Sequence, residues 1–304
     1  MIHKAKKYTL LLALSLISTF PLTSQSLPCN QNISKEEIEQ KPLVVFIHGT
    51  LFSAYRWLVH WLDCPLGFAP ATKQGNKYFL GRIPYILHEA APEAFPLDSF
   101  YLFGWSGSLN FEARKKAAHQ LYHELKKHKR PITVIAQSHG CNVALNLAQI
   151  AQEHKDTEFI IDRLVLLACP VQEHNAHCVK SHLFKQVFSL YSTNDIMQCL
   201  DPQGIYKKTK ELLKSGNKKI PFFSQRTFEP ASNLTQARII LNGSGPAHVD
   251  FILKKFLIHL QTILKELEAA THASRMQREE THYTVTINKN TNAYTIIKNK
   301  DNQA

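Results

Sequence analysis

Ser138 stands in a short pattern of residues that suits a reactive serine. The segment runs Ile132-Thr-Val-Ile-Ala136-Gln137-Ser138-His139-Gly140, so an apolar run of strand type leads into small-x-Ser-x-small. A serine on a sharp turn between a strand and a helix has a strained backbone, and the residues two positions before and after it must be small to avoid collision. Ala136 and Gly140 meet this condition. The turn would raise the Ser138 hydroxyl above the sheet, next to the positive end of the following helix.

Ser138 in this context resembles the nucleophile of the α/β-hydrolase superfamily, and in particular of its lipase-like and esterase-like members. The resemblance covers roughly residues 42–268. Ala-x-Ser-x-Gly differs from the commoner Gly-x-Ser-x-Gly, although alanine at the first position occurs among lipases of this superfamily. The resemblance implies an α/β-hydrolase fold and hydrolysis of a carboxylic ester, of a lipid or another acyl compound, through a Ser-His-Asp triad and an acyl-enzyme intermediate.

The order of the triad in this superfamily is serine, then an acid, then histidine, and it implies two further residues. Asp195 follows the apolar run Val187–Ser192, and Asp201 is the substitute acid six residues later. His248 follows the last apolar run and a glycine-rich loop, and is therefore the expected base. The alternatives are a helix N-cap or an Asx turn for Asp195 and a surface N-cap for His248.

The turn after the first apolar run, Phe46-Ile47-His48-Gly49-Thr50, is the expected oxyanion hole. In the resembling family, the residue after the glycine of a His-Gly turn donates one backbone N–H, here that of Thr50. The residue after the nucleophile, here His139, donates the other. Backbone donors suit this task because they need no reorganisation as charge develops. The alternative is an ordinary glycine turn at the end of a strand.

Ser106 is a second serine of similar context, in Gly104-Trp105-Ser106-Gly107-Ser108. The helical pattern after it is amphipathic and strongly charged, whereas the helix after a nucleophile is expected to pack at the centre of the sheet. The sequence therefore favours Ser138 over Ser106, and the Trp-Ser-Gly turn is expected to form a wall of the cleft.

Short apolar runs alternate with helical patterns from residue 42 onward, which predicts a mostly parallel sheet with helices on both faces. Strands are predicted at Leu43–Ile47, Ser99–Phe103, Ile132–Ala136, Leu164–Ala168, Val187–Ser192 and Ala237–Leu241. Helices are predicted at Phe111–Lys129, Asn142–Glu153 and His248–Leu267.

The expected α/β-hydrolase domain spans residues 42–270, with two irregular excursions that are possible lids. Residues 63–97 are rich in proline and aromatic side chains, and residues 201–236 are basic and polar. After residue 270 the chain becomes polar, and residues 271–304 are predicted to form a C-terminal β-hairpin or tail.

Residues 1–26 have the pattern of a secretory signal peptide. Three lysines precede the apolar run Tyr8–Leu22, and Ser24-Gln25-Ser26 is a suitable cleavage site. We therefore expect a secreted or periplasmic protein with an N-terminal extension at residues 27–41. The alternative is a membrane anchor through residues 8–22.

The six cysteines show no spacing typical of a metal site, and neither a metal nor a cofactor is expected. Cys141 and Cys169 lie in apolar segments and are expected to be buried thiols. Cys178 could pair with Cys199, and Cys29 with Cys64. His174, His177 and His182 lack the His-x-x-x-His spacing of a helical metal pair.

The composition is that of a globular protein: 304 residues, 44% hydrophobic and 20% charged. The formal net charge of +12 is spread over short basic groups, which are typical of solvated helix surfaces. This spread of charge makes a nucleic-acid partner unexpected and leaves peripheral contact with an anionic membrane possible, whereas the ester substrate is what the resemblance to the α/β-hydrolase superfamily implies. Two other functions stay open: a non-catalytic hydrolase-like protein that binds an anionic membrane or a partner, and an acyltransferase with the same triad.

Overall fold

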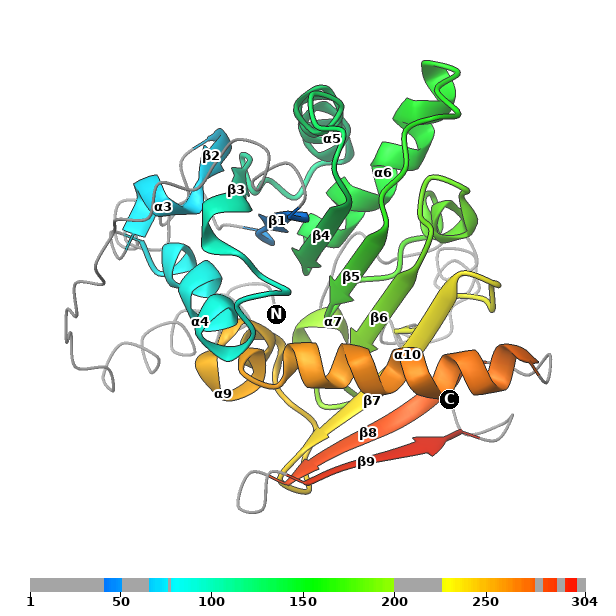
Figure 1. Cartoon of the computed structure of the whole chain (residues 1–304). Coiled ribbons are helices and arrows are strands. Elements are labelled where there is room, and N and C mark those ends of the chain that lie inside the picture. The colour runs from blue at the N-terminus through cyan, green and yellow to red at the C-terminus, as the bar shows by residue number, and fades with distance from the viewer. Residues whose placement is uncertain are drawn as a thin grey trace, which may run out of the picture. The chain divides into compact units, whose positions relative to one another are not determined.

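The structure is a computed structural model that describes residues 41–50, 66–75, 78–199, 226–276, 281–288 and 293–299 (Figure 1). All of them belong to one compact unit, residues 35–304. The signal-like segment, residues 27–40 of the N-terminal extension, and Asp201 lie outside the described residues. None of the described helices is long and apolar enough to cross a bilayer.

The described strands form one sheet in the order β2-β3-β1-β4-β5-β6-β7-β8-β9. Strands β3, β1 and β4 to β8 run parallel, and β2 and β9 are antiparallel strands at the two edges. The strands are β1 Leu43–Ile47, β2 Gly67–Pro70, β3 Phe100–Gly104, β4 Ile132–Gln137, β5 Arg163–Leu167, β6 Val187–Tyr191, β7 Leu234–Leu241, β8 His282–Asn288 and β9 Ala293–Lys298. The prediction of a mostly parallel α/β sheet is confirmed.

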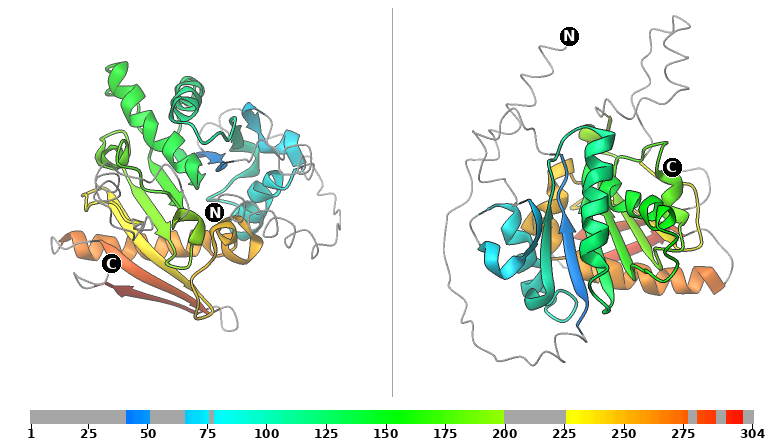
Figure 2. Two further views of the ribbon diagram at one scale, coloured as in Figure 1. Left: turned by 180° about the vertical axis from the view of Figure 1, so that it is seen from behind. Right: turned by 90° about the horizontal axis from the view of Figure 1, so that it is seen from above.

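Helices cover both faces of this sheet (Figures 1 and 2). The α-helices are α3 Ala71–Gln74, α4 Ile83–Ala90, α5 Phe111–Leu125, α6 His139–Glu153, α7 Ile196–Cys199, α9 Lys254–Leu257 and α10 Leu260–Met276. Helices α5 and α6 pack on the face to which Leu43, Val45 and Ile47 point. Helices α4, α9 and α10 pack on the opposite face, against Val44 and Phe46. Because side chains alternate along a strand, the uninterrupted apolar sequence of β1 serves both cores.

Strand β7 begins three residues earlier than predicted, because two polar residues at its start are satisfied inside the protein. Thr235 Oγ1 lies 3.0 Å from Thr271 Oγ1 on α10. Gln236 exchanges two hydrogen bonds with the backbone of Phe228, at 2.7 and 3.0 Å. Buried polar side chains with such partners are compatible with a central strand, which composition alone does not indicate.

The single helix predicted at His248–Leu267 is wrong. A 3-10 helix at His248–Ile252 is followed by α9 and then by α10. The break falls at Leu253, whose backbone is extended with φ −91° and ψ 152°. Apolar periodicity continues across this break because Phe251, Phe256 and Leu260 all enter the same core. Periodicity therefore showed which face is buried without showing where the backbone turns.

The two excursions differ in how much of them the structure describes. The first, residues 63–97, contains β2, α3, a 3-10 helix at Leu80–Arg82 and α4. Pro84 stands in the first turn of α4, where proline costs no hydrogen bond. Of the second excursion, residues 201–225 lie outside the described residues and the end belongs to β7. The C-terminal hairpin of β8 and β9 extends the sheet, and Tyr283, Val285 and Ile287 of β8 are core residues.

Candidate active site

Ser138 occupies a strained turn between β4 and α6. Its φ of 54° and ψ of −132° lie in a region that residues other than glycine rarely adopt. Its N–H donates to the carbonyl of Leu167 on β5 at 2.9 Å, and its carbonyl accepts from Cys141 at 2.9 Å. These hydrogen bonds fix the turn at the carboxyl edge of the sheet, with the N-terminus of α6 directly behind the hydroxyl.

Gly140 explains why the residue two positions after Ser138 must be small. A Cβ atom on Gly140 would lie 2.5 Å from the carbonyl oxygen of His48 and 2.7 Å from that of Ile47. Both contacts are with backbone atoms of the neighbouring strand and turn, which cannot rotate away. The glycine therefore allows α6 to begin immediately beside β1.

The His48-Gly49-Thr50 turn lies directly against the serine turn. A Cβ atom on Gly49 would lie 2.6 Å from Ser138 Cβ. Thr50 Oγ1 is buried and has no hydrogen-bond partner among the described residues. The N–H of His139 is one of the first amides of α6, which have no partner within the helix. Of the two residues expected to form the oxyanion hole, His139 therefore follows Ser138 directly, and Thr50 follows Gly49, which lies against Ser138.

Asp195 and His248 are brought together at the same edge of the sheet. Nδ1 of His248 donates to Oδ2 of Asp195 at 2.7 Å. Asp195 is fully buried in the turn after β6, and the His248 side chain, in the loop after β7, is 14% exposed. Because Nδ1 carries the proton of this hydrogen bond, Nε2 is left to accept one. No hydrogen bond joins Ser138 Oγ to this imidazole among the described residues, and such bonds commonly tighten only when substrate is bound.

Further contacts that sequence reasoning missed hold the Asp195 turn and the His248 loop together. Asn194 Nδ2 donates to Ser244 Oγ at 3.1 Å, which joins the turn to the loop. Asp250 Oδ2 accepts from the N–H of Ala247 at 2.9 Å and braces the 3-10 helix that carries His248. The Ser-Thr-Asn-Asp string marks a turn in the sequence. Nothing in the sequence shows which loop that turn contacts.

Ser106 is placed differently from Ser138. It is exposed in the turn after β3, its φ is not among the positive values, and its Oγ accepts from the N–H of Ser108 at 3.4 Å. Helix α5 begins only at Phe111, where the side chain of Asn110 caps it. Ser106 therefore has neither the strained backbone nor the helix N-terminus that distinguish Ser138.

Large apolar side chains are exposed around this edge of the sheet. Leu66 is 68% exposed beside β2, whose Gly67 pairs with Gly104 at the carboxyl end of β3. Leu109 and Phe111 follow β3 and are 39% and 42% exposed. Ile196, next to Asp195, is 68% exposed. These four residues are called the apolar rim below.

Helix α5 and the loop after β5 bring the Arg114 guanidinium close to the His174 imidazole. Arg114 on α5 is fully buried, and its Nη2 donates to Gln172 Oε1 at 3.2 Å. Burial, followed by the nearby Arg114 guanidinium, lowers the pKa of His174 to about 4. His174 is therefore neutral at pH 7, although part of its surface is exposed to water.

Cysteine and histidine positions do not form a metal site in the part of the chain that the structure describes. Cys141, Cys169 and Cys178 are buried there and form no disulfide, and burial raises the pKa of Cys178 to about 11. The pairing of Cys178 with Cys199 is therefore not formed. Cys29 and Cys64 lie outside the described residues.

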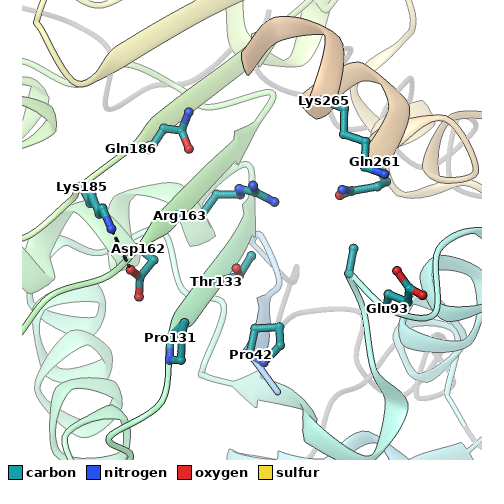
Figure 3. A pocket seen from close by; sticks show the side chains of 11 residues that line it. Pro42, Glu93, Pro131, Thr133, Asp162, Arg163, Lys185, Gln186, Gln261 and Lys265 are labelled. Atoms are coloured by element: carbon teal, nitrogen blue, oxygen red, sulfur yellow. Dashed lines mark ion pairs between the residues drawn. The ribbon is translucent and has the colours of Figure 1, made fainter. Parts of the chain in front are cut away.

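An open cavity of about 590 Å³ lies at the opposite, amino edge of the strands (Figure 3). Pro42, Pro131 and Asp162, which line it, each precede a strand of the sheet. The ion pair between Lys185 and Asp162 crosses its rim at 3.6 Å. Because parallel strands point from this cavity toward Ser138, the cavity is separated from the serine by the length of the sheet.

No protein-family model matches the chain, and a comparison of its sequence with curated proteins found no match. Solved structures similar to it include a thermostable esterase from Pseudomonas putida, with 12% identity and a TM-score of 0.38 over 74% of this chain and 70% of that one. A fungal esterase from Rhizomucor miehei has 10% identity and a TM-score of 0.40 over 78% and 77%. A hyperthermophilic esterase from the archaeon Pyrobaculum calidifontis has 11% identity and a TM-score of 0.37 over 78% and 76%.

The topology itself classifies the chain. The serine stands on a strained turn between a central strand and a helix, and the acid and the histidine follow in that chain order after later strands of the same parallel sheet. Strand, turn and helix in this arrangement are the structural context that gives a small-x-Ser-x-small motif its meaning. This chain therefore has the α/β-hydrolase fold.

Proposed function

We propose that this protein is a serine hydrolase that cleaves a carboxylic ester through an acyl-enzyme intermediate. The observation that carries the proposal is the 2.7 Å hydrogen bond between His248 and the buried Asp195, at the edge of the sheet where Ser138 occupies its strained turn. A binding protein has no need of a buried carboxylate that orients an imidazole beside a strained serine.

Each group has one role in this reaction. Ser138 Oγ attacks the ester carbonyl carbon while Nε2 of His248 takes the hydroxyl proton. Asp195 keeps the imidazole in the required tautomer and stabilises its positive charge. The N–H groups of Thr50 and His139 donate to the oxygen of the tetrahedral intermediate. The imidazolium then returns the proton to the departing alkoxide, and water, activated by the same histidine, releases the acid from Ser138.

The apolar rim supports an ester with an apolar acyl chain. Leu66, Leu109, Phe111 and Ile196 come from three separate segments of the sequence and are exposed at the edge that carries Ser138. Burying such side chains against an acyl chain gains free energy in proportion to the apolar area removed from water. We therefore propose a lipid or another acyl ester as substrate. We also propose that the protein acts outside the cytoplasm, because residues 1–26 have the pattern of a secretory signal peptide.

The test is hydrolysis of a p-nitrophenyl ester series of increasing acyl length by the protein from residue 27 onward. The Ser138→Ala variant is compared with Ser106→Ala, which removes the serine of similar sequence context and serves as the matched control. We expect Ser138→Ala to lower kcat by about 10⁵-fold or more and Ser106→Ala to leave it within about twofold.

Labelling with a serine-directed fluorophosphonate checks the nucleophile independently of the substrate. The wild type and Ser106→Ala are expected to be labelled at Ser138, and Ser138→Ala to remain unlabelled. Hydrolysis at equal background rates in folded wild type and Ser138→Ala, without labelling, would refute the proposal. Transfer of the acyl group to an added alcohol in preference to water would identify an acyltransferase instead.

A further inference from the structure

Trp105 is a buried residue beside the candidate active site for which the mechanism above has no role. It follows β3, is 3% exposed, and belongs to the Gly-Trp-Ser-Gly turn whose serine is not the nucleophile. Its side chain and its backbone both contact the same residue, His48. The indole Nε1–H donates to the carbonyl oxygen of His48 at 2.8 Å. The backbone N–H of Trp105 donates to Nε2 of the His48 ring at 3.1 Å, and the two rings stack with an interplanar angle of 18°.

These contacts determine the tautomer of His48. Because Nε2 accepts a hydrogen bond, the proton of the neutral ring is on Nδ1. Nδ1–H in turn donates to the carbonyl oxygen of Gly49 at 2.7 Å. The His48 ring therefore connects the backbone of Trp105 to the Gly49 carbonyl.

The Gly49 carbonyl and the Thr50 N–H belong to one planar peptide unit. In a trans peptide these two groups point in opposite directions, so fixing the carbonyl also fixes the direction of the N–H. The Thr50 N–H is one of the two donors assigned to the oxyanion. Its direction therefore depends on the chain of contacts from Trp105 through His48 to Gly49.

The second contact of Trp105 holds the His48 carbonyl at a point where the turn passes close to the start of α6. The His48 carbonyl that accepts from the indole is the same atom that a Cβ on Gly140 would approach to 2.5 Å. A Cβ on Gly49 would approach Ser138 Cβ to 2.6 Å. With so little space, a small displacement of the His48 carbonyl moves the Thr50 donor relative to Ser138.

We propose that Trp105 is a positioning residue that directs the Thr50 N–H toward the oxyanion. It does so by donating hydrogen bonds to the carbonyl oxygen and to the ring Nε2 of His48. This inference rests on the proposed function. Donors of an oxyanion hole act on the transition state more than on the bound ester. Removing a hydrogen bond between Trp105 and His48 should therefore lower kcat and leave KM nearly unchanged.

The test compares Trp105→Phe with Phe103→Leu in kcat, KM and a labelled-amide NMR spectrum. Trp105→Phe removes the indole N–H and keeps an aromatic ring and the backbone donor. Phe103→Leu reduces a fully buried side chain on β3, the strand that precedes Trp105, and in the same core, so it controls for loss of packing. We expect Trp105→Phe to lower kcat about tenfold or more, with KM within about twofold. The Thr50 amide resonance should shift in Trp105→Phe and not in Phe103→Leu.

A second pair of variants tests the contacts of the His48 ring separately from the contact of the His48 carbonyl. His48→Ala removes the Nδ1 donor, whereas His48→Asn places an amide N–H near the same position. Asn is expected to restore part of the kcat that Ala loses. Equal kcat in wild type and Trp105→Phe, or an unmoved Thr50 resonance, would overturn the inference while leaving the hydrolase standing. An inactive wild type without fluorophosphonate labelling would instead refute the proposed function.

Discussion

His248 Nδ1 lies 2.7 Å from Asp195 Oδ2, although 53 positions of sequence separate the two residues. One follows β7 and the other follows β6, two neighbouring parallel strands whose carboxyl ends share an edge. The carboxylate is fully buried, so its charge is screened little by water. The pair is therefore built to keep one imidazole in one tautomer.

Replacing this carboxylate by an amide should abolish the proposed ester hydrolysis without unfolding the protein. Asp195→Asn keeps the size of the side chain but no longer requires the proton to be on Nδ1, so we expect kcat to fall about 10⁴-fold. Steady-state hydrolysis, together with a thermal unfolding curve, measures this. Glu158→Gln, at an exposed position, is the matched control and should retain full kcat. A loss below tenfold in folded Asp195→Asn would assign the acid to another residue.

Gly140→Ala should damage both stability and catalysis. The new Cβ meets the His48 and Ile47 carbonyls at 2.5 and 2.7 Å, so the start of α6 must move. Overpacking of this kind costs about 1–3 kcal/mol in free energy of unfolding, and kcat should fall because Ser138 moves with the helix. Urea unfolding and steady-state kinetics check both effects. Gly75→Ala, which meets no atom within 4 Å but has a φ of +50°, should lower stability alone.

Asn194 and Ser244 should act as one unit. Their 3.1 Å hydrogen bond joins the Asp195 turn to the His248 loop. We expect Asn194→Ala and Ser244→Ala each to lower kcat severalfold, and the double variant to lower it no further, since either change already breaks the contact. A double-mutant cycle on kcat measures the coupling. Strictly multiplicative effects would show that the two residues act independently.

Asp156 should make stability depend on pH in the acid range. A hydrogen bond from Lys126, at 2.6 Å, and one from Tyr122 Oη, also at 2.6 Å, hold the pKa of Asp156 at about 2, below its usual 3.8. Because the pKa is lower in the folded state, this group stabilises the fold above pH 3.8. That contribution is lost as the pH falls from 3.8 through 2.

Asp156→Asn is accordingly expected to lower the free energy of unfolding by about 1 kcal/mol at pH 7, after allowance for solvent screening of the exposed lysine. The difference from wild type should shrink as the pH falls toward 2. Urea unfolding at several pH values between 7 and 2 measures this. An unchanged difference at every pH would show that the carboxylate charge has no part in the effect.

The C-terminal hairpin should be part of the folding unit through β8. Ile287 is fully buried in the core formed with α10, whereas Ile297 on β9 is 58% exposed. We expect Ile287→Ala to lower the free energy of unfolding by about 2–4 kcal/mol, and Ile297→Ala to change it by less than about 0.5 kcal/mol. Urea unfolding of the two variants makes the comparison, and equal values would place the hairpin outside the cooperative core.

Several features of this protein could be predicted from the sequence because they depend on local chemistry. Only small residues tolerate positions 136 and 140 around a serine on a strained turn, so the motif itself indicated the backbone that Ser138 adopts. Uninterrupted apolar runs such as Leu43–Ile47 indicated strands buried on both faces, and the alternation of runs and helical patterns indicated a parallel sheet. The positions of Asp195 and His248 came from a resemblance in chain order, and the structure places those two residues in contact.

Other features were decided by the tertiary structure alone. Thr235 and Gln236 could join β7 because distant residues satisfy their polar groups, and Leu253 could break a helical pattern while its neighbours remained in one core. The contacts of Trp105 with His48, and of Asn194 with Ser244, connect residues 57 and 50 positions apart. Local sequence cannot specify such pairs, because their free energy depends on which loops the sheet brings to the same edge. The sequence determined which groups could react, and the packing of the loops determined how they are held.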